Sequence, residues 1–260
     1  VMEKNCIRPF PEDRRKDTSL FLSHEVNSSD PYILAGYLEE IDKFDADFFS
    51  IPKGEAIYMD PLHRLFLVTA YEAAADAGYC REKFFGSNTG VYVGTDHARK
   101  SGEYMNLFEE MDLLSLVGSW PGLLASRVSY AMNLTGPSLV IDTACSSGLV
   151  SVHTACQALR NNECRMAIAG GGNIALFPGK SDAMNSLEGN DNCLRAFDKE
   201  AKGTLWGEGV GAVLLKPLKQ AVKDRDKIYG VIKGSAINND GLSNGITAPN
   251  AKAQESVLIK

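Results

Sequence analysis

Cys145 lies where a strand-like run of residues turns abruptly into a helix-like run. Small residues surround it, since Ala144 precedes it and two serines follow, so a substrate can reach the sulfur. The unpaired N–H groups and partial positive charge of a helix start favour a thiolate over a thiol, and they can also hold the oxygen of a thioester under attack. The position therefore predicts a nucleophilic cysteine, against the alternative of a small buried residue.

A thiolate nucleophile usually works beside a histidine, and the candidates in this sequence are His24, His63, His97 and His153. His153 follows eight residues after Cys145 on the same predicted helix, which places it ~12 Å further along the axis. His63, in the first turn of another predicted helix, is interpreted as a surface or capping residue. His97 follows a strand end and could face a cleft, so a cysteine hydrolase using Cys145 and His97 stays open as an alternative. Otherwise we expect the base to lie outside this chain.

The elements that must position Cys145 alternate between strand-like and helix-like patterns. The strand-like runs are short and apolar, whereas the helix-like runs place apolar residues three and four apart. The predicted strands are residues 89–94, 138–141 and 165–169, and the predicted helices are 61–77, 123–132 and 146–160. This alternation indicates a layered α/β fold. In the helix after Cys145, we expect the face formed by Leu149, Val152, Cys156 and Leu159 to be buried in the core.

The later part of the sequence has a less regular pattern. Residues 173–202 carry scattered Gly, Pro, Asn and Asp and are expected to run over the surface. Residues 210–216 and 228–237 are predicted strands with a short helix at 218–222 between them, and 251–260 has a helical pattern. No repeat or linker divides the chain, so we expect one compact piece. The chain begins with Val1 and ends in a helical pattern without a glycine cap or proline stop, so we expect a sequence that is cut at both ends.

Neither the glycine runs nor a basic cluster predicts a ligand site. Residues 170–172 and 207–209 lack the spacing of phosphate-binding loops and are interpreted as structural turns. A group of basic residues near the start could meet an acidic carrier protein, but acidic neighbours dilute it and a solvated loop is the favoured interpretation. This group comprises Lys4, Arg8, Arg14, Arg15 and Lys16.

Composition narrows the class of protein. The 27 basic and 33 acidic residues give a net charge of −6, which argues against nucleic acid as a partner. The six cysteines form no C-x-x-C pair and have no histidine at metal-ligand spacing, so we expect neither a metal site nor a disulfide framework. No apolar stretch approaches the ~18 residues of a membrane helix, and the start does not read as a signal peptide. We expect a reducing, cytoplasmic compartment and no membrane association.

The segment around Cys145 closely resembles the active-site motif of β-ketoacyl synthases, specifically the ketosynthase domains of modular polyketide synthases. The resemblance runs along the whole chain and rests on several motifs at once. The matching segments are Asp142-Thr143-Ala144-Cys145-Ser146-Ser147-Gly148, Met59-Asp60-Pro61, Ser126–Tyr130, Leu134–Ser138, Ala196-Phe197-Asp198, Trp206–Gly211, Gly234–Gly241 and Ser243–Asn250. Two departures, Cys193-Leu194-Arg195 and Leu62-His63, do not touch the predicted nucleophile.

The resemblance implies a thiolase-like, layered αβαβα fold and a division of the chain. About 1–222 would form the N-terminal half of that fold, and 226–260 the start of the C-terminal half. It also implies a homodimer whose two-fold axis lies near residues 139–141, where the strand before the nucleophile would pair antiparallel with its mate. The apolar, β-branched character of that strand is compatible with such pairing.

For the chemistry, the resemblance implies an acyltransferase within a multifunctional enzyme. Cys145 would take an acyl chain from the phosphopantetheine arm of an acyl carrier protein, with its own backbone N–H as half of the oxyanion hole; no cofactor would bind directly. Decarboxylative Claisen condensation with a malonyl extender would follow. The family's two catalytic histidines lie in motifs that this sequence lacks, so we expect the chain alone not to condense. The alternative is a non-condensing relative that relays acyl chains or serves as a structural module.

Overall fold

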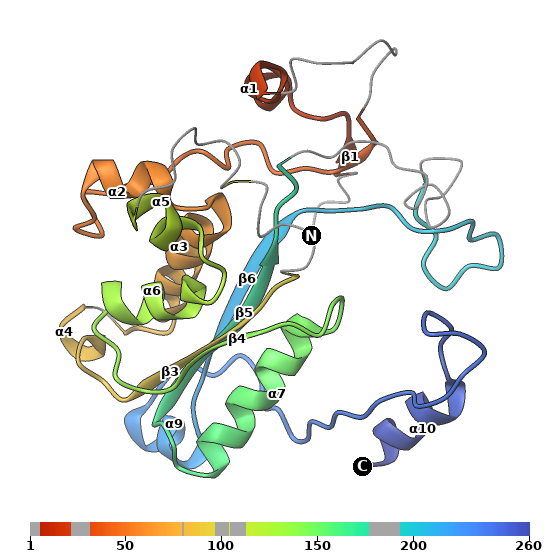
Figure 1. The fold of residues 1–260 in the computed structure, drawn as a ribbon. Helices are drawn as coiled ribbons and strands as arrows, with labels where there is room; N and C mark the ends of the chain where they lie inside the picture. The colour runs from red at the N-terminus through yellow and green to blue at the C-terminus, as the bar shows by residue number, and fades with distance from the viewer. Residues whose placement is uncertain (1–5, 22–31, 80, 97–103, 105–112, 177–192) are drawn as a thin grey trace.

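The short apolar runs of the sequence come together as one four-stranded sheet in the computed structural model of this chain (Figure 1). The structure describes residues 6–21, 32–79, 81–96, 104, 113–176 and 193–260. The strands are β3 (Thr89–Gly94), β4 (Ser138–Ile141), β5 (Met166–Asn173) and β6 (Gly209–Leu215), in the order β4-β3-β5-β6. β3 pairs in parallel with both β4 and β5, and β6 pairs antiparallel with β5. The sheet is therefore mixed, with β4 and β6 outermost among the described strands.

Helices cover the two faces of this sheet (Figure 1). The described helices are α1 (Glu12–Phe21), α2 (Lys53–Tyr58), α3 (Pro61–Asp76), α4 (Arg81–Phe84), α5 (Leu113–Ser119), α6 (Leu123–Ala131), α7 (Ser147–Arg160), α9 (Leu218–Asp224) and α10 (Ala251–Ile259). α3 and α6 pack on one face and α7 on the other. α3 begins as predicted, with Asp60 accepting a hydrogen bond from the N–H of Leu62 and Pro61 in the first turn.

The side chains of β3 alternate between the two faces of the sheet, so that this strand contributes to the core on each face. Val91 and Val93 belong to the larger core cluster with α3 and α6, whereas Tyr92 belongs to a second cluster with residues of α7. All three side chains are buried. A strand covered on both faces needs apolar residues at every position, which explains why this run is continuously apolar rather than alternating. The predicted α/β class is confirmed.

Residues 170–172, which the sequence predicted as a turn, lie inside β5 instead. A Cβ at Gly170 would stand 2.1 Å from the Gly211 carbonyl oxygen of β6, and one at Gly171 would stand 2.5 Å from the Gly94 carbonyl oxygen. Glycine therefore serves close strand packing here and not a change of chain direction. The second glycine run also differs from the prediction: Gly207 forms a β-bridge with Gly36, and β6 begins at Gly209.

Two predictions are wrong, one for a strand at residues 228–237 and one for the buried face of α7. Residues 228–237 form no strand; they have no described partner strand, and an extended run needs one to satisfy its backbone groups. In α7, Leu149 is 80% exposed, and the buried residues are Ser147, Ser151, Ala155, Ala158 and Leu159. Small side chains let this helix approach the sheet closely, so the packed face is set by size and not by hydrophobicity alone.

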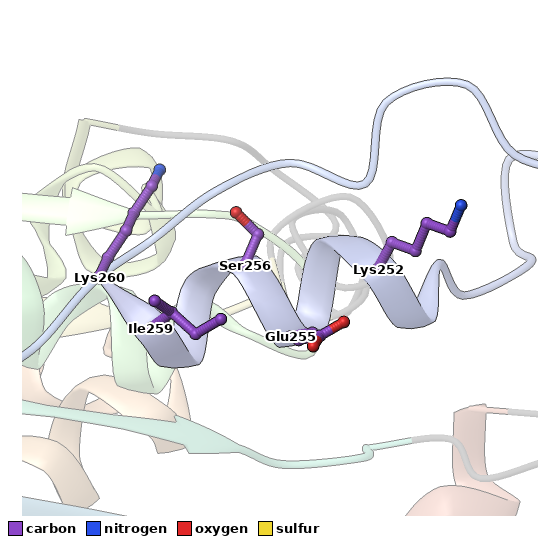
Figure 2. A pocket seen from close by; sticks show the side chains of 5 residues that line it. All are labelled: Lys252, Glu255, Ser256, Ile259 and Lys260. Atoms are coloured by element: carbon purple, nitrogen blue, oxygen red, sulfur yellow. The ribbon is translucent and has the colours of Figure 1, made fainter.

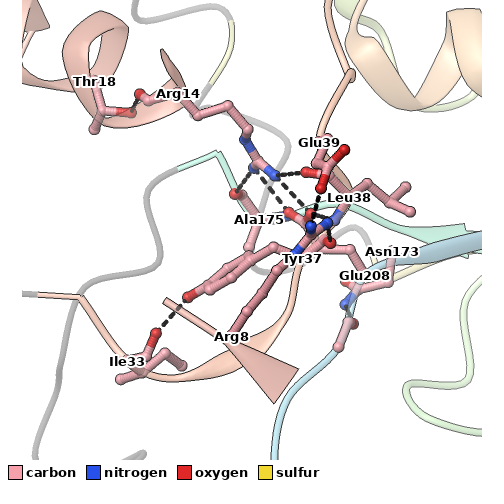
Figure 3. A network of polar contacts seen from close by, with 11 residues as sticks. Arg8, Arg14, Thr18, Ile33, Tyr37, Leu38, Glu39, Asn173, Ala175 and Glu208 are labelled. Atoms are coloured by element: carbon pink, nitrogen blue, oxygen red, sulfur yellow. Dashed lines mark hydrogen bonds and ion pairs between the residues drawn. The ribbon is translucent and has the colours of Figure 1, made fainter. Parts of the chain in front are cut away.

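The N-terminal basic cluster does not form a solvated loop at Arg14. β1 (Ile7–Arg8) pairs antiparallel with β2 (Ala35–Gly36), and Arg14 of α1 reaches a buried carboxylate, Glu208, 194 residues later in the chain (Figure 3). Their side chains are 8% and 2% exposed. Burial of a charge requires such a partner, which the sequence pattern does not reveal.

Candidate active site

The turn that carries Cys145 joins the end of β4 at Ile141 to the start of α7 at Ser147. Cys145 is exposed, as predicted for a residue that meets a substrate. Ala144, directly before it, has φ of 54°, in the left-handed region that residues with a side chain seldom adopt. The sharp strand-to-helix turn thus concentrates its backbone strain one residue before the nucleophile.

Side chains on either side of the turn bind its backbone. The Asp142 carboxylate accepts a hydrogen bond from the Ala144 N–H at 3.0 Å. The Ser147 hydroxyl donates to the Ala144 carbonyl at 2.6 Å and accepts from the Thr143 N–H at 2.8 Å. The Ser146 hydroxyl donates back to the Thr143 carbonyl at 2.8 Å. These bonds stabilise a conformation that would otherwise be unfavourable.

The sheet beneath the turn allows α7 to approach through glycines. A Cβ at Gly94 of β3 would stand 2.3 Å from the carbonyl carbon of Ser147, and one at Gly171 would stand 3.4 Å from the Cα of Gly148. One helical turn later, the buried Ser151 hydroxyl lies 2.8 Å from the Gly170 carbonyl of β5. Gly94 and Gly171 therefore fix the start of α7 to two neighbouring strands at backbone distance, and the Ser151 bond connects the next helical turn to β5.

The other described cysteines lie in different surroundings from Cys145. Burial raises the pKa of the Cys156 and Cys164 thiols above the ordinary value. Cys6 and Cys193 are exposed, but neither lies next to a helix start. Cys80 lies outside the described residues. Within the described part of the chain, Cys145 is the cysteine at a strand-to-helix junction.

The structure places two of the four histidines, and corrects one prediction. His63 is not a surface residue, because it is buried, at 3% exposure, in the first turn of α3 beside the buried Pro61 and Leu62. His153 lies on α7, and its Nδ1 is 3.0 Å from the Ser235 hydroxyl. His24 and His97 lie outside the described residues, so the pairing of Cys145 with His97 stays untested.

Within the described ranges, no three His, Cys, Asp or Glu side chains gather so as to hold a metal ion, and no helix has the length and apolar character needed to cross a bilayer. A surface depression lies along α10 and is lined by that helix alone (Figure 2). Its residues are Lys252, Glu255, Ser256, Ile259 and Lys260. This depression includes no residue of the Cys145 turn.

Comparison with known proteins places this geometry in a family. The family model described as "Beta-ketoacyl synthase, N-terminal domain" matches residues 1–221. The chain belongs to the β-ketoacyl synthase family. Within that family it is of the ketosynthase type found in polyketide synthases, as the relatives described next show.

The relatives are long proteins, of which this chain matches a small part. It is 40% identical over 258 residues to polyketide synthase PksM of Bacillus subtilis (strain 168), covering 98% of this chain and 6% of that protein. It is 41% identical over 259 residues to the spectinabilin polyketide synthase system protein NorB of Streptomyces orinoci, covering 98% and 12% respectively.

A solved structure shows the same fold. The ketosynthase from module 6 of the bacillaene synthase from Bacillus subtilis 168 superimposes with a TM-score of 0.79 at 40% identity. The match covers 98% of this chain and 42% of that one. The predicted thiolase-like α/β fold is confirmed by this match.

Sequence reasoning identified the turn but missed the residues that hold it. It treated Ser146 and Ser147 only as small neighbours of Cys145 and gave Asp142 and Gly94 no role. A carboxylate two residues before a tight turn is a known signal for a side-chain-to-backbone hydrogen bond and could have pointed to Asp142. No local signal reveals the contact between Gly94 and Ser147, because the two residues are 53 positions apart in the sequence.

Proposed function

We propose that Cys145 is the nucleophile of a ketosynthase and is acylated by a thioester carried on the phosphopantetheine arm of an acyl carrier protein. The observation that carries the proposal is the exposed thiol on the sharp turn before α7, in a chain of the β-ketoacyl synthase family. The thiolate attacks the thioester carbonyl, a new S–C bond forms, and the carrier's thiolate leaves and takes up a proton.

The Cys145 N–H is the oxyanion donor that the turn supplies in this proposal. The hydrogen bonds of the turn itself run from the Ser146 N–H to the Thr143 carbonyl and from the Ser147 N–H to the Ala144 carbonyl. Among the described residues, no carbonyl of the turn takes up the Cys145 N–H, which supports its assignment to a substrate oxygen. A backbone donor aimed at a developing negative charge lowers the barrier to acyl transfer without any rearrangement.

Condensation follows acylation in the complete enzyme. A malonyl thioester loses carbon dioxide, and the resulting enolate attacks the acyl-Cys145 carbonyl, so that a C–C bond forms and the Cys145 thiolate is released. The histidines that assist this step in the family are expected outside this chain. If the complete protein only relays acyl groups, it will load Cys145 and form no β-ketoacyl product.

The partners in this proposal are acyl carrier proteins, other polyketide synthase domains and a second copy of the same domain, in a reducing, cytoplasmic compartment. The edge of β4 supports the homodimer. The Val91 N–H donates to the Pro137 carbonyl and the Thr95 N–H to the Ile141 carbonyl, so residues 137, 139 and 141 face β3. By the alternation of a parallel ladder, the backbone groups of Val140 then face away from β3, where a mate could pair.

Mass spectrometry tests the assignment of Cys145 directly. The intact ketosynthase-containing protein is treated with an acyl thioester and the adduct is mapped after proteolysis, beside Cys145→Ala and Cys193→Ala. Cys193 is a matched control because it is also exposed. We expect label on Cys145 that Cys145→Ala abolishes and Cys193→Ala retains. Label that survives Cys145→Ala, or that sits chiefly on another cysteine, would refute the proposal.

A further inference from the structure

The peptide group between Ala144 and Cys145 is the part of the turn that matters most for acyl transfer. It contains both the Ala144 carbonyl and the Cys145 N–H, and because a peptide group is planar and trans, the two point in opposite directions. Whatever fixes the direction of the Ala144 carbonyl also fixes the direction of the Cys145 N–H. The turn can therefore aim its oxyanion donor through a bond made on the other side of the peptide.

Ser147 makes that bond. Its hydroxyl donates to the Ala144 carbonyl at 2.6 Å and accepts from the Thr143 N–H at 2.8 Å. One side chain therefore connects the peptide between Asp142 and Thr143 to the peptide between Ala144 and Cys145. The Ser147 N–H also donates to the Ala144 carbonyl, at 3.1 Å. The hydroxyl makes the shorter contact with the Ala144 carbonyl, and it also binds the Thr143 N–H.

Ser147 is itself held in place from below. It is 3% exposed, and its backbone lies against Gly94 so closely that a Cβ there would be 2.4 Å from the Ser147 carbonyl oxygen. A hydroxyl on a backbone fixed to the sheet is a rigid anchor for the exposed turn above it.

Asp142 holds the strained residue from the other side. Its carboxylate accepts from the Ala144 N–H at 3.0 Å, so both backbone groups of Ala144 are bound by side chains. With φ of 54°, Ala144 would otherwise relax toward a more common conformation and rotate the following peptide.

We propose that Ser147 is a positioning residue that aims the Cys145 N–H at the thioester oxygen, with Asp142 supporting it through Ala144. This inference rests on the proposed function, since it assigns these two side chains a role in the acylation of Cys145. Neither side chain touches the substrate; each acts through the backbone of the turn. A misaimed oxyanion donor slows acyl transfer but does not slow a reaction that needs only the thiolate.

The test compares two reactions of Cys145 in the intact ketosynthase-containing protein. Acyl loading from an N-acetylcysteamine thioester needs the oxyanion donor, whereas alkylation by iodoacetamide needs only the thiolate. In Ser147→Ala we expect acyl loading to slow by at least about tenfold and alkylation to change by less than about twofold. Ser151→Ala is the matched control, because it removes a buried hydroxyl one helical turn further on that bonds Gly148 and Gly170 and not the turn. Both of its rates should stay within about twofold of wild type.

A second pair of variants covers the case in which Ser147→Ala does not fold. Asp142 is exposed, so Asp142→Ala and Asp142→Asn should both fold. Asn keeps the oxygen acceptor and should load at a near wild-type rate, whereas Ala should slow loading several-fold with alkylation unchanged.

The outcomes separate the two claims. If wild-type protein loads on Cys145 but Ser147→Ala matches Ser151→Ala, or loses loading and alkylation equally, the positioning role is wrong and the proposed function stands. Equal loading by Asp142→Ala and Asp142→Asn would also refute the part assigned to Asp142. If Cys145→Ala retains the acyl label, both the proposed function and this inference fail.

Discussion

Gly94 and Ser147 lie in direct backbone contact, so that a single added methyl group on Gly94 would overlap the Ser147 carbonyl at 2.3 Å from its carbon. Gly94 ends β3 and Ser147 begins α7, which makes this contact the junction between the sheet and the turn that carries Cys145. The position of Cys145 therefore depends on a residue of another strand that carries no side chain.

We expect Gly94→Ala to lower the free energy of unfolding by about 1–3 kcal/mol and to slow acyl loading, because the helix start must move away from the strand. Urea unfolding and loading rates measure the two effects. Gly148→Ala is the control, since a Cβ at Gly148 meets no atom within 4 Å and alanine favours a helix. A Gly94→Ala protein as stable and as reactive as Gly148→Ala would contradict the contact.

Arg14→Met should destabilise the protein by about 3–5 kcal/mol, because it leaves the Glu208 carboxylate buried without its cation. The Leu38 and Ala175 N–H groups would remain as its partners. Chemical denaturation measures the change. Lys16→Met on the same helix removes an exposed charge and should leave the unfolding midpoint unaltered. Equal midpoints for the two variants would show that the buried pair contributes little.

The surroundings of Lys216 predict that the protein loses stability at alkaline pH. Burial acts to lower its pKa, but hydrogen bonds to two aspartates and to Tyr79 outweigh burial and leave the pKa of Lys216 raised above 10.5. Burial is also the main cause that raises the pKa of the Tyr79 hydroxyl. Groups with a raised pKa stabilise the fold fully below their ordinary pKa and lose that contribution as pH rises through the folded value.

Wild type should therefore exceed Lys216→Met in unfolding free energy by about 2–3 kcal/mol at neutral pH. The difference should stay constant up to about pH 10 and shrink above it. Urea titrations at a series of pH values measure it, with Lys219→Met, an exposed position on α9, as the control. A difference that grew with rising pH would have the wrong sign for this arrangement.

Val140→Pro should separate the proposed dimer while preserving the β3–β4 ladder, because the N–H it removes faces away from β3. Ile141→Pro, one residue on, removes a donor that faces β3 and should unfold the region. Light scattering of the intact domain at micromolar concentration distinguishes the cases. A dimeric Val140→Pro protein, or a monomeric wild type that is active, would rule out pairing at this edge.

The 260-residue chain by itself should form no β-ketoacyl product. Of the two described histidines, His63 is buried in α3 and His153 contacts Ser235. Incubation with malonyl carrier protein and an acyl thioester, followed by assays for carbon dioxide and product, tests this expectation. Release of carbon dioxide together with a condensed product would show that the chain holds a complete catalytic set.

Local sequence patterns predicted those helices and strands that depend on residues close in the sequence or on burial of an apolar run, whatever its partner. β3, β4 and α3 follow from apolar runs, glycine boundaries and the Asp60–Pro61 start, and Cys145 follows from the junction of two such elements. The motif resemblance supplied the family. These features need no knowledge of a specific distant partner.

The predictions failed where a distant partner decides the structure. Residues 228–237 have a strand-like composition but no described strand beside them. Arg14 looked like one of several solvated charges, and its burial depends on Glu208, which the pattern around residue 14 cannot indicate. Leu149 was assigned to the core from helical spacing, yet the close approach of α7 to the glycines of β3 and β5 selects a face of serine and alanine.

Close backbone contacts at the two ends of β3 also limit how this protein can change over evolutionary time. A clash between two side chains can be repaired by a second mutation that shrinks the neighbour, but a Cβ at Gly94 meets backbone atoms of Ser147, and one at Gly136 meets backbone atoms of Thr89 and Gly90. No substitution of the neighbour relieves such a clash, because every residue carries the same backbone carbonyl. A core side chain can be exchanged in steps as its neighbours change, whereas these glycines cannot, so we expect substitutions in this region to fall on other residues.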